Sequence, residues 1–273
     1  MITRFVFIGP SRIIESAITL SFDYNLNPLP DRTYIISPYP QHKLDSVFRE
    51  FEIDSSAYTL LDDLYFERFY DLSRYKHDHW YYQQALKFCA FDHFDSEYFL
   101  LQDCDQVPLK RFDFFVDDKL NFKAENLWNP YQELYAEMVE RIIGLKRVLN
   151  YSLVNELMPY TKRDWNNLKT LIEKRNECFW LDAFPNARNL GEPKWLSEFE
   201  FLGIYKTNQS EGWTYYPAIP QPAINTWDDF YNHDWSRQDT IKFLTQPLKY
   251  MNLTEAKTVL KHLKNFDKVK QNK

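Results

Sequence analysis

The most informative segment of the chain reads Tyr98-Phe99-Leu100-Leu101-Gln102-Asp103-Cys104-Asp105-Gln106-Val107-Pro108-Leu109. Its apolar start is typical of a fully buried strand in the middle of a parallel sheet. The strand ends at two carboxylates, Asp103 and Asp105, and Pro108 prevents it from simply continuing. Ligands bind at the carboxyl ends of strands in α/β sheets, and hard divalent cations prefer oxygen ligands. The segment therefore predicts a site where Mg²⁺ or Mn²⁺ holds a diphosphate.

Composition and charge indicate which fold classes and binding partners suit this chain. The chain has 273 residues, 44% of them hydrophobic and 18% aromatic, which suits one large α/β domain or a domain with an appendage. The formal net charge is −6 and no block of Lys and Arg occurs, so we expect no nucleic-acid partner. Cys89, Cys104 and Cys178 lie far apart, which fits a reducing cytosol better than a disulfide framework. Since we find neither a signal peptide nor an apolar run of ~20 residues, we expect a soluble cytoplasmic protein without a transmembrane segment.

The first hundred residues alternate apolar runs with helical patterns, which indicates a parallel sheet with strands near 5–8, 33–38 and 58–61. Gly9-Pro10 ends the first strand, and Ser11 and Arg12 open a helix, so backbone N–H groups there can face an anion or a nucleotide. An ordinary strand–helix turn explains the same residues equally well. Asp62 follows the third strand, where it either holds a ribose or base edge or belongs to a solvated loop.

A helix is predicted where Tyr81, Ala85, Phe88 and Cys89 recur at helical spacing, and this spacing places Gln84 and Lys87 on one face, toward the site after the next strand. His77 and His79 suggest metal ligands, but we expect them before the helix in a loop or cap role.

The second half of the chain continues the α/β pattern. Ser197-Glu198-Phe199-Glu200 is flanked by aromatic residues, which is typical either of a sugar-handling site or of a helix with one acidic edge. The other expected elements are a hairpin at 112–126 around Asp117-Asp118-Lys119, a helix from Asn129-Pro130 to Gly144, a strand at 151–158, a helix after the capping pattern Thr161–Asp164, a strand at 213–219 and two helices in the last forty residues, the final one capped by Thr254.

Two enzyme classes share an apolar strand that ends in Asp-x-Asp. A-type glycosyltransferases use the pair to bind Mn²⁺ or Mg²⁺ on the diphosphate of a nucleotide-sugar, whereas haloacid-dehalogenase-like phosphatases use the first Asp as a nucleophile. Asp103-Cys104-Asp105-Gln106-Val107 matches the phosphatase pattern as written. That motif normally lies on the first strand before a glycine-rich turn, however, and this chain has five glycines and no convincing later Gly-Asp-x-x-x-Asp motif.

An ordered set of motifs across roughly residues 5–235 resembles a family of A-type glycosyltransferases of bacteria and phages, most of whose members have no assigned function. The matching pieces are Gly9-Pro10, Thr33-Tyr34-Ile35-Ile36-Ser37-Pro38, Trp80-Tyr81-Tyr82-Gln83-Gln84-Ala85-Leu86-Lys87, Asp103-Cys104-Asp105, Asn129-Pro130-Tyr131, Ser197-Glu198-Phe199-Glu200 and His233. One departure is Asn155-Glu156 before Met158, where the family has a His pair, so the acceptor contact of those histidines is in doubt.

The resemblance implies a GT-A-like, Rossmann-like α/β fold, with a mixed, mostly parallel sheet flanked by helices in a single domain with a C-terminal helical extension. We expect that domain over residues 1–235, with the nucleotide-sugar half at about 1–110 and the acceptor half at about 111–235. Helices in 236–273 would then pack on the same domain.

The resemblance also implies an activity, in which a hexosyl or related sugar moves from a nucleotide-sugar, with a UDP-sugar favoured, to a glycan or another hydroxyl acceptor. Asp103, Asp105 and His233 would hold Mn²⁺ or Mg²⁺, whose positive charge stabilises the leaving nucleoside diphosphate. Glu198 would contact the acceptor hydroxyl, as a general base in an inverting reaction or as a binding residue in a retaining one. The expected donor-binding residues are Pro10, Ser11, Arg12, Asp62, Gln84, Lys87, Asp103 and Cys104. The alternatives are a phosphatase or phosphotransferase with Asp103 as its nucleophile and a non-catalytic carbohydrate-binding protein.

Overall fold

The computed structural model describes residues 1–9, 11–125, 130–154, 157–187, 196–218, 226–235, 238, 240–242 and 251–271. The chain divides into two compact units that are interleaved along the sequence. Unit 1 comprises Met1–Phe5, Asp63–Leu101 and Phe115–Ala218, and unit 2 comprises Val6–Asp62, Gln102–Phe114 and Ile219–Lys273. The domain boundaries expected from the sequence, 1–235 with halves at about 1–110 and 111–235 and an extension at 236–273, stay a prediction.

Unit 2 contains the parallel strands that the sequence predicts near the amino terminus. The strands are β1 (Ile2–Phe7), whose end belongs to this unit, β3 (Arg32–Ser37) and β4 (Thr59–Asp62). In the sheet, β3 lies between β1 and β4. β3 and β4 are parallel, and their last residues, Ser37 and Asp62, lie opposite each other. Helices α1 (Ile13–Leu20) and α2 (Gln41–Glu50) connect these strands. The expected alternation of strands and helices, and with it the mostly parallel α/β architecture, is confirmed.

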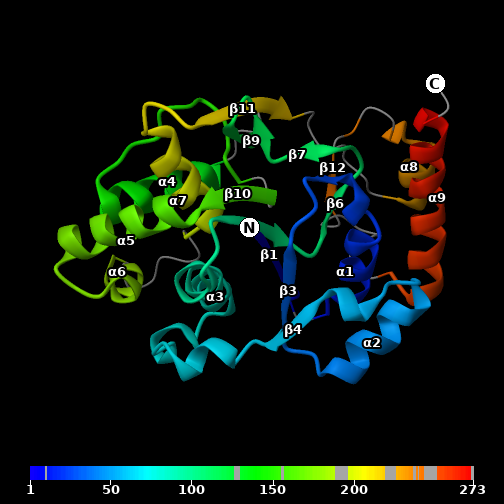
Figure 1. Ribbon diagram of the computed structural model, residues 1–273, viewed down its shortest axis with the longest axis horizontal. Coiled ribbons are helices and arrows are strands. Elements are labelled where there is room, and N and C mark those ends of the chain that lie inside the picture. Colours follow the sequence, from blue (N-terminus) through cyan, green and yellow to red (C-terminus); the bar gives the residue numbers. More distant parts are fainter. Residues whose placement is uncertain are drawn as a thin grey trace. The chain divides into compact units, whose positions relative to one another are not determined.

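Helix α9 (Leu253–Gln271), drawn in red in Figure 1, contacts α1 in unit 2. Its buried face joins a core with α1 and the end of β1 and includes Val259, Leu260 and Leu263. The prediction that Thr254 caps this helix is wrong, because the helix begins at Leu253. The side chain of Asn252 instead accepts the backbone N–H groups of Thr254 at 2.9 Å and Glu255 at 3.0 Å.

Unit 1 contains the strand order β10-β5-β1, so β5 (Tyr98–Asp103) has a neighbour on each side. This position explains why its apolar run is buried, as predicted. The strand expected at 151–158 lies later in the chain, since β10 comprises Leu157–Thr161. Part of the reason is that the backbone N–H of Leu153 donates to a carboxylate of Glu200 at 3.0 Å and not to a strand. Asn155 and Glu156 lie outside the described residues.

Helices of unit 1 contact one another in the pairs α3–α5, α3–α7, α4–α7 and α5–α6 (Figure 1). Their bounds are α3 His79–His93, α4 Pro130–Ile143, α5 Lys162–Asn176, α6 Trp180–Ala187 and α7 Glu198–Thr207. Two predicted helix ends are confirmed: α4 ends before Gly144, which has φ +74°, and Thr161 caps α5 by accepting the N–H of Asp164. The structure also shows that Ser197 caps α7. The cap of α3 is Asp78, so His79 is its first residue and does not precede it as expected.

A second sheet in unit 1 contains the predicted hairpin, in which β8 (Phe115–Val116) pairs antiparallel with β9 (Lys119–Glu125). Asp117 and Asp118 connect them with positive φ angles of 50° and 59°, as a tight hairpin turn requires. β11 (Trp213–Ala218) runs parallel to β9.

The shorter elements mostly belong to unit 2. They are β2 (Leu26–Asn27) parallel to β7 (Phe112–Asp113), β6 (Gln106–Pro108) antiparallel to β12 (Thr240–Lys242), α8 (Trp227–Asn232), and 3₁₀ turns at Asp23–Asn25, Ser55–Ala57, Tyr65–Arg68 and Ser73–Tyr75. Within the described ranges, no helix has the length and apolar character needed to span a bilayer.

Candidate functional site

Cys104 and Asp105 form the tight turn between β5 and β6 in unit 2. Asp103 is the last residue of β5 and is half-buried, while Asp105 is 8% exposed. The hydroxyl of Thr19 on α1 donates to the carbonyl of Cys104 at 2.7 Å, which ties the turn to that helix. Burial raises the pKa of the Cys104 thiol well above its ordinary value, so this side chain stays uncharged at neutral pH. The two carboxylates are therefore held at the carboxyl end of β5, as the sequence predicts.

Arg12 lies between two carboxylates in the same unit. Its Nη1 atom is 3.8 Å from Oδ2 of Asp105 and 3.2 Å from Oε1 of Glu15. Burial raises the pKa of Glu15, an effect that the nearby Arg12 guanidinium partly offsets. Arg12 thus supplies positive charge next to the second carboxylate of the turn.

The connection from β1 to α1 includes a residue in an uncommon backbone conformation. Ser11 has φ +66°, and its N–H donates to the hydroxyl of Tyr39 at 2.5 Å. The N–H of Arg12 donates to the carbonyl of Gly9 at 3.2 Å. Pro10 lies outside the described residues. The nucleotide contacts expected of Ser11 and Arg12 stay a prediction.

Two other predicted residues of unit 2 lie at element ends. Asp62 is exposed at the end of β4. His233 directly follows α8, and its ring centre lies 4.5 Å from that of Trp235. Its Nε2 atom is buried and has no hydrogen-bond partner among the described residues. Those residues contain no group of three or more His, Cys, Asp or Glu side chains that could hold a metal ion. The role of His233 as a third ligand stays a prediction.

In unit 1, one face of α3 holds the start of α7. Nε1 of Trp80 donates to the carbonyl of Leu196 at 2.6 Å, and Oε1 of Gln84 accepts the N–H of Glu198 at 3.3 Å. One turn further along, the ammonium of Lys87 forms an ion pair with the Glu198 carboxylate. Positions 80, 84 and 87 share a helix face, so two motifs of the resemblance, Trp80–Lys87 and Ser197–Glu200, meet through these side chains.

The ion pair between Lys87 and Glu198 is buried, since each residue is 1% exposed. The ammonium of Lys87 also lies 4.8 Å from the centre of the Phe199 ring, whose π-face attracts cations. In this arrangement each charge neutralises the other. The predicted roles of Gln84 and Lys87 in donor binding, and of Glu198 at the acceptor, stay predictions.

Glu200, the second acid of the Ser-Glu-Phe-Glu motif, is also buried and paired. Its carboxylate accepts Nε–H of Arg147 at 2.6 Å and the N–H of Leu153 at 3.0 Å. Burial raises its pKa, while Arg147 acts in the opposite direction. Every residue of α7 is buried, so the two acids of this helix do not face solvent. Sequence reasoning missed Arg147, because its position 53 residues before Glu200 leaves no local signal.

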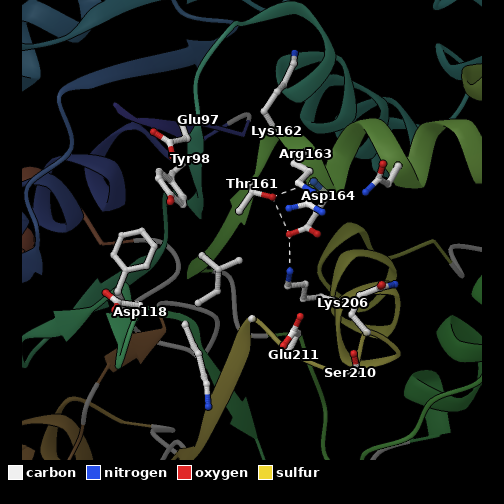
Figure 2. A pocket seen from close by; sticks show the side chains of 16 residues that line it. Glu97, Tyr98, Asp118, Thr161, Lys162, Arg163, Asp164, Lys206, Ser210 and Glu211 are labelled. Carbon is white, nitrogen blue, oxygen red and sulfur yellow. Dashed lines mark hydrogen bonds and ion pairs between the residues drawn. The ribbon is translucent and has the colours of Figure 1, made fainter.

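A polar pocket of unit 1 was also not indicated by the sequence (Figure 2). Asp164 accepts hydrogen bonds there from the Thr161 hydroxyl and from the Lys206 ammonium, both at 2.7 Å. The sequence singled out Thr161 and Asp164 only as a helix cap. The sequence did not indicate Lys206 as their partner, because Lys206 reaches the pocket from α7, 42 positions further along the chain.

Comparisons with known proteins were made for the whole chain. No protein-family model and no curated protein matches it. Among solved structures, it is similar to the galactosyltransferase LgtC in complex with donor and acceptor sugar analogues, with 10% identity, a TM-score of 0.47, and coverage of 96% of this chain and 95% of that one. It is similar to mouse xyloside xylosyltransferase 1 at 11% identity and a TM-score of 0.46, and the match covers 86% of this chain and 91% of that one. The values for glucosyl-3-phosphoglycerate synthase of Mycobacterium tuberculosis are 11% identity, a TM-score of 0.36 and 67% of each chain.

Proposed function

We propose that this protein is a metal-dependent glycosyltransferase that transfers a sugar from a nucleotide-sugar, with a UDP-sugar favoured, to a glycan or another hydroxyl acceptor. The observation that carries the proposal is the Asp103-Cys104-Asp105 turn, which presents two carboxylates at the carboxyl end of a buried strand. Ligands of α/β proteins bind at this end of the sheet. The ordered motifs of the sequence support the same function. The separated cysteines, all free, support a reducing, cytoplasmic setting.

Asp103 and Asp105 would hold Mn²⁺ or Mg²⁺ together with the diphosphate of the donor. The residues fit such an ion, because Mg²⁺ commonly binds one or two carboxylates and completes its coordination with water and substrate phosphates. When bound, the cation stabilises negative charge on the departing nucleoside diphosphate. His233 is assigned as a further ligand, which is supported by its Nε2 atom having no hydrogen-bond partner in the described part of the chain.

Arg12 would bind a phosphate oxygen of the donor. Its guanidinium lies 3.8 Å from Asp105, and an arginine is suited to charge-assisted hydrogen bonds with phosphates. Ser11, with its left-handed backbone, and Asp62, at the end of β4, would line the nucleotide from the neighbouring strand ends. The uncharged Cys104 thiol adds no negative charge where a diphosphate would bind.

Isothermal titration tests the proposal with UDP and GDP, each with and without Mn²⁺. We expect one nucleotide to bind wild type only in the presence of Mn²⁺ and to lose this binding in the Asp103→Asn variant. Asp31→Asn serves as the matched control, because Asp31 is an exposed carboxylate of unit 2 outside the turn. It is expected to bind as wild type does.

Three other results would contradict the transferase proposal or support one of its alternatives. A folded wild-type protein that binds neither nucleotide under any condition would contradict the transferase function. A covalent phosphoryl group on Asp103 after incubation with a phosphate ester would establish the phosphatase alternative. Binding of sugars without any dependence on Mn²⁺ or Asp105 would support the non-catalytic carbohydrate-binding alternative.

A further inference from the structure

The polar pocket of unit 1 has a volume of 660 Å³, within the range of about 300–1,000 Å³ that is typical of small-molecule sites. It is lined by the start of β5, the β8–β9 hairpin, the start of α5 and the end of α7 (Figure 2). Tyr98, the first residue of β5, belongs to it, whereas Asp103 is the last residue of that strand. The nucleotide-sugar site proposed above uses none of the residues that line this pocket.

The charges of the lining are balanced. The basic residues are Lys119, Lys162, Arg163 and Lys206, and the acidic residues are Glu97, Asp118, Asp164 and Glu211. A site for a phosphate or a nucleotide gathers positive charge to offset that of the ligand. Four basic and four acidic residues do not provide such an excess, so an uncharged ligand suits the pocket better.

Two of the four basic side chains already form hydrogen bonds or ion pairs with other residues of the protein. Nζ of Lys162 donates to three carbonyls at the end of α3 and just beyond it, those of Phe91, Asp92 and Phe94, at 2.9, 3.0 and 2.8 Å. An ammonium has three N–H donors, so this set uses all of them. Nζ of Lys206 lies 2.7 Å from Oδ2 of Asp164. The three carbonyls therefore use every N–H group of Lys162, and the Asp164 carboxylate offsets the charge of Lys206.

The rest of the lining offers hydrogen-bonding groups beside aromatic rings. Exposed polar side chains from α5 and from the segment after α7 include Arg163, Ser210 and Glu211. Tyr98 and Phe115 are half-buried and pack edge to face, with ring centres 4.9 Å apart and planes at 81°. Hydroxyl groups of a sugar need both donors and acceptors, while its C–H face packs on aromatic rings.

We propose that this pocket binds an uncharged oligosaccharide at a site separate from the nucleotide-sugar site. The lining has no excess of basic residues to favour an anion, and the combination of aromatic rings with donors and acceptors matches the two faces of a sugar ring. The pocket would hold a glycan while the Asp103-Cys104-Asp105 turn is free of donor. Its occupation therefore requires neither a nucleotide nor a metal ion.

Titrations of the ¹⁵N-labelled protein by NMR test this site with cellotetraose, maltotetraose and chitotetraose, without nucleotide or metal. We expect at least one tetrasaccharide to shift the amide signals of the pocket residues in a saturable manner. Ser210→Trp, which fills the pocket from an exposed position, and the double variant Arg163→Ala/Glu211→Ala are expected to weaken binding at least tenfold. Lys174→Ala is the matched control, since Lys174 is exposed on α5 outside the pocket.

Asp103→Asn separates this proposal from the transferase function, because it is expected to retain full tetrasaccharide binding while it loses the nucleotide. The proposal would be overturned if none of the three sugars shifts the pocket signals of the folded protein. Shifts that survive both pocket variants would overturn it as well. Inorganic phosphate that saturates the same signals more tightly than the sugars would identify an anion site instead.

Discussion

Removing one partner of the buried ion pair between Lys87 and Glu198 is expected to destabilise unit 1 strongly. Each residue is 1% exposed, so a charge that loses its ion-pair partner in this place is poorly hydrated. The variants Lys87→Met and Glu198→Met each leave one such charge. The double variant leaves none, and methionine has an unbranched chain that fills a similar space.

The size of the effect follows from the burial. Breaking a buried pair from one side costs about 3–5 kcal/mol, whereas replacing both partners by apolar side chains is often neutral or stabilising. At about 2–4 °C per kcal/mol for chains of 150–250 residues, each single variant should lose roughly 6–20 °C in melting temperature. The double variant should be more stable than either single variant, because the penalty arises from a buried charge that has lost its ion-pair partner.

Urea unfolding of the wild type, the two single variants and the double variant at one low temperature measures the complete cycle. Arg74→Met is the matched control, because the Arg74–Asp182 pair has side chains 46% and 48% exposed. Exposed pairs contribute about 0–1 kcal/mol, so this control should differ little from the wild type. The reasoning would be refuted by single variants that lose no more than this control. A double variant whose loss equals the sum of the single losses would refute it too.

Three further variants test other parts of the structure. Gly203→Ala should destabilise by about 1–3 kcal/mol in urea unfolding, although alanine favours helices, because the new Cβ would lie 2.7 Å from Cβ of Leu153. Burial raises the pKa of Glu15 from 4.5, so its contribution to stability is fully present below the unfolded pKa and is lost as the pH rises through the folded pKa. Glu15→Gln should therefore gain stability relative to the wild type as urea titrations move from pH 4.5 toward neutral, and an unchanged difference would contradict this. Asn252→Ala should cost about 1 kcal/mol as a lost helix cap, whereas Thr254→Ala, its matched control, should cost little.

Local patterns in the sequence predicted the elements that depend on neighbouring residues. The buried strand before Asp103 follows from four consecutive apolar residues, and the hairpin follows from Asp117-Asp118 between strand-forming residues. The cap at Thr161 follows from a known spacing of polar side chains. These features need no information from distant parts of the chain, and the structure confirms them.

Contacts between distant residues could not be predicted in the same way. Lys87 and Glu198 are 111 positions apart, and neither motif alone shows that they meet inside the protein. The strand expected at 151–158 begins only at Leu157, and Leu153 donates its N–H to Glu200, which is 47 positions away. The polar pocket likewise combines four separate segments. Tertiary packing decided each of these features, and a pattern of neighbouring residues along the chain carries no information about contacts between distant residues.

Release of UDP from a panel of UDP-sugars, with and without Mn²⁺, tests the central claim most directly. The account predicts that the wild type and Asp31→Asn release UDP from at least one of these sugars only when Mn²⁺ is present. Asp103→Asn and Asp105→Asn should stay folded and release none. Equal release by wild type and Asp103→Asn, or release that Mn²⁺ does not affect, would contradict the claim that this turn is the metal and diphosphate site of a glycosyltransferase.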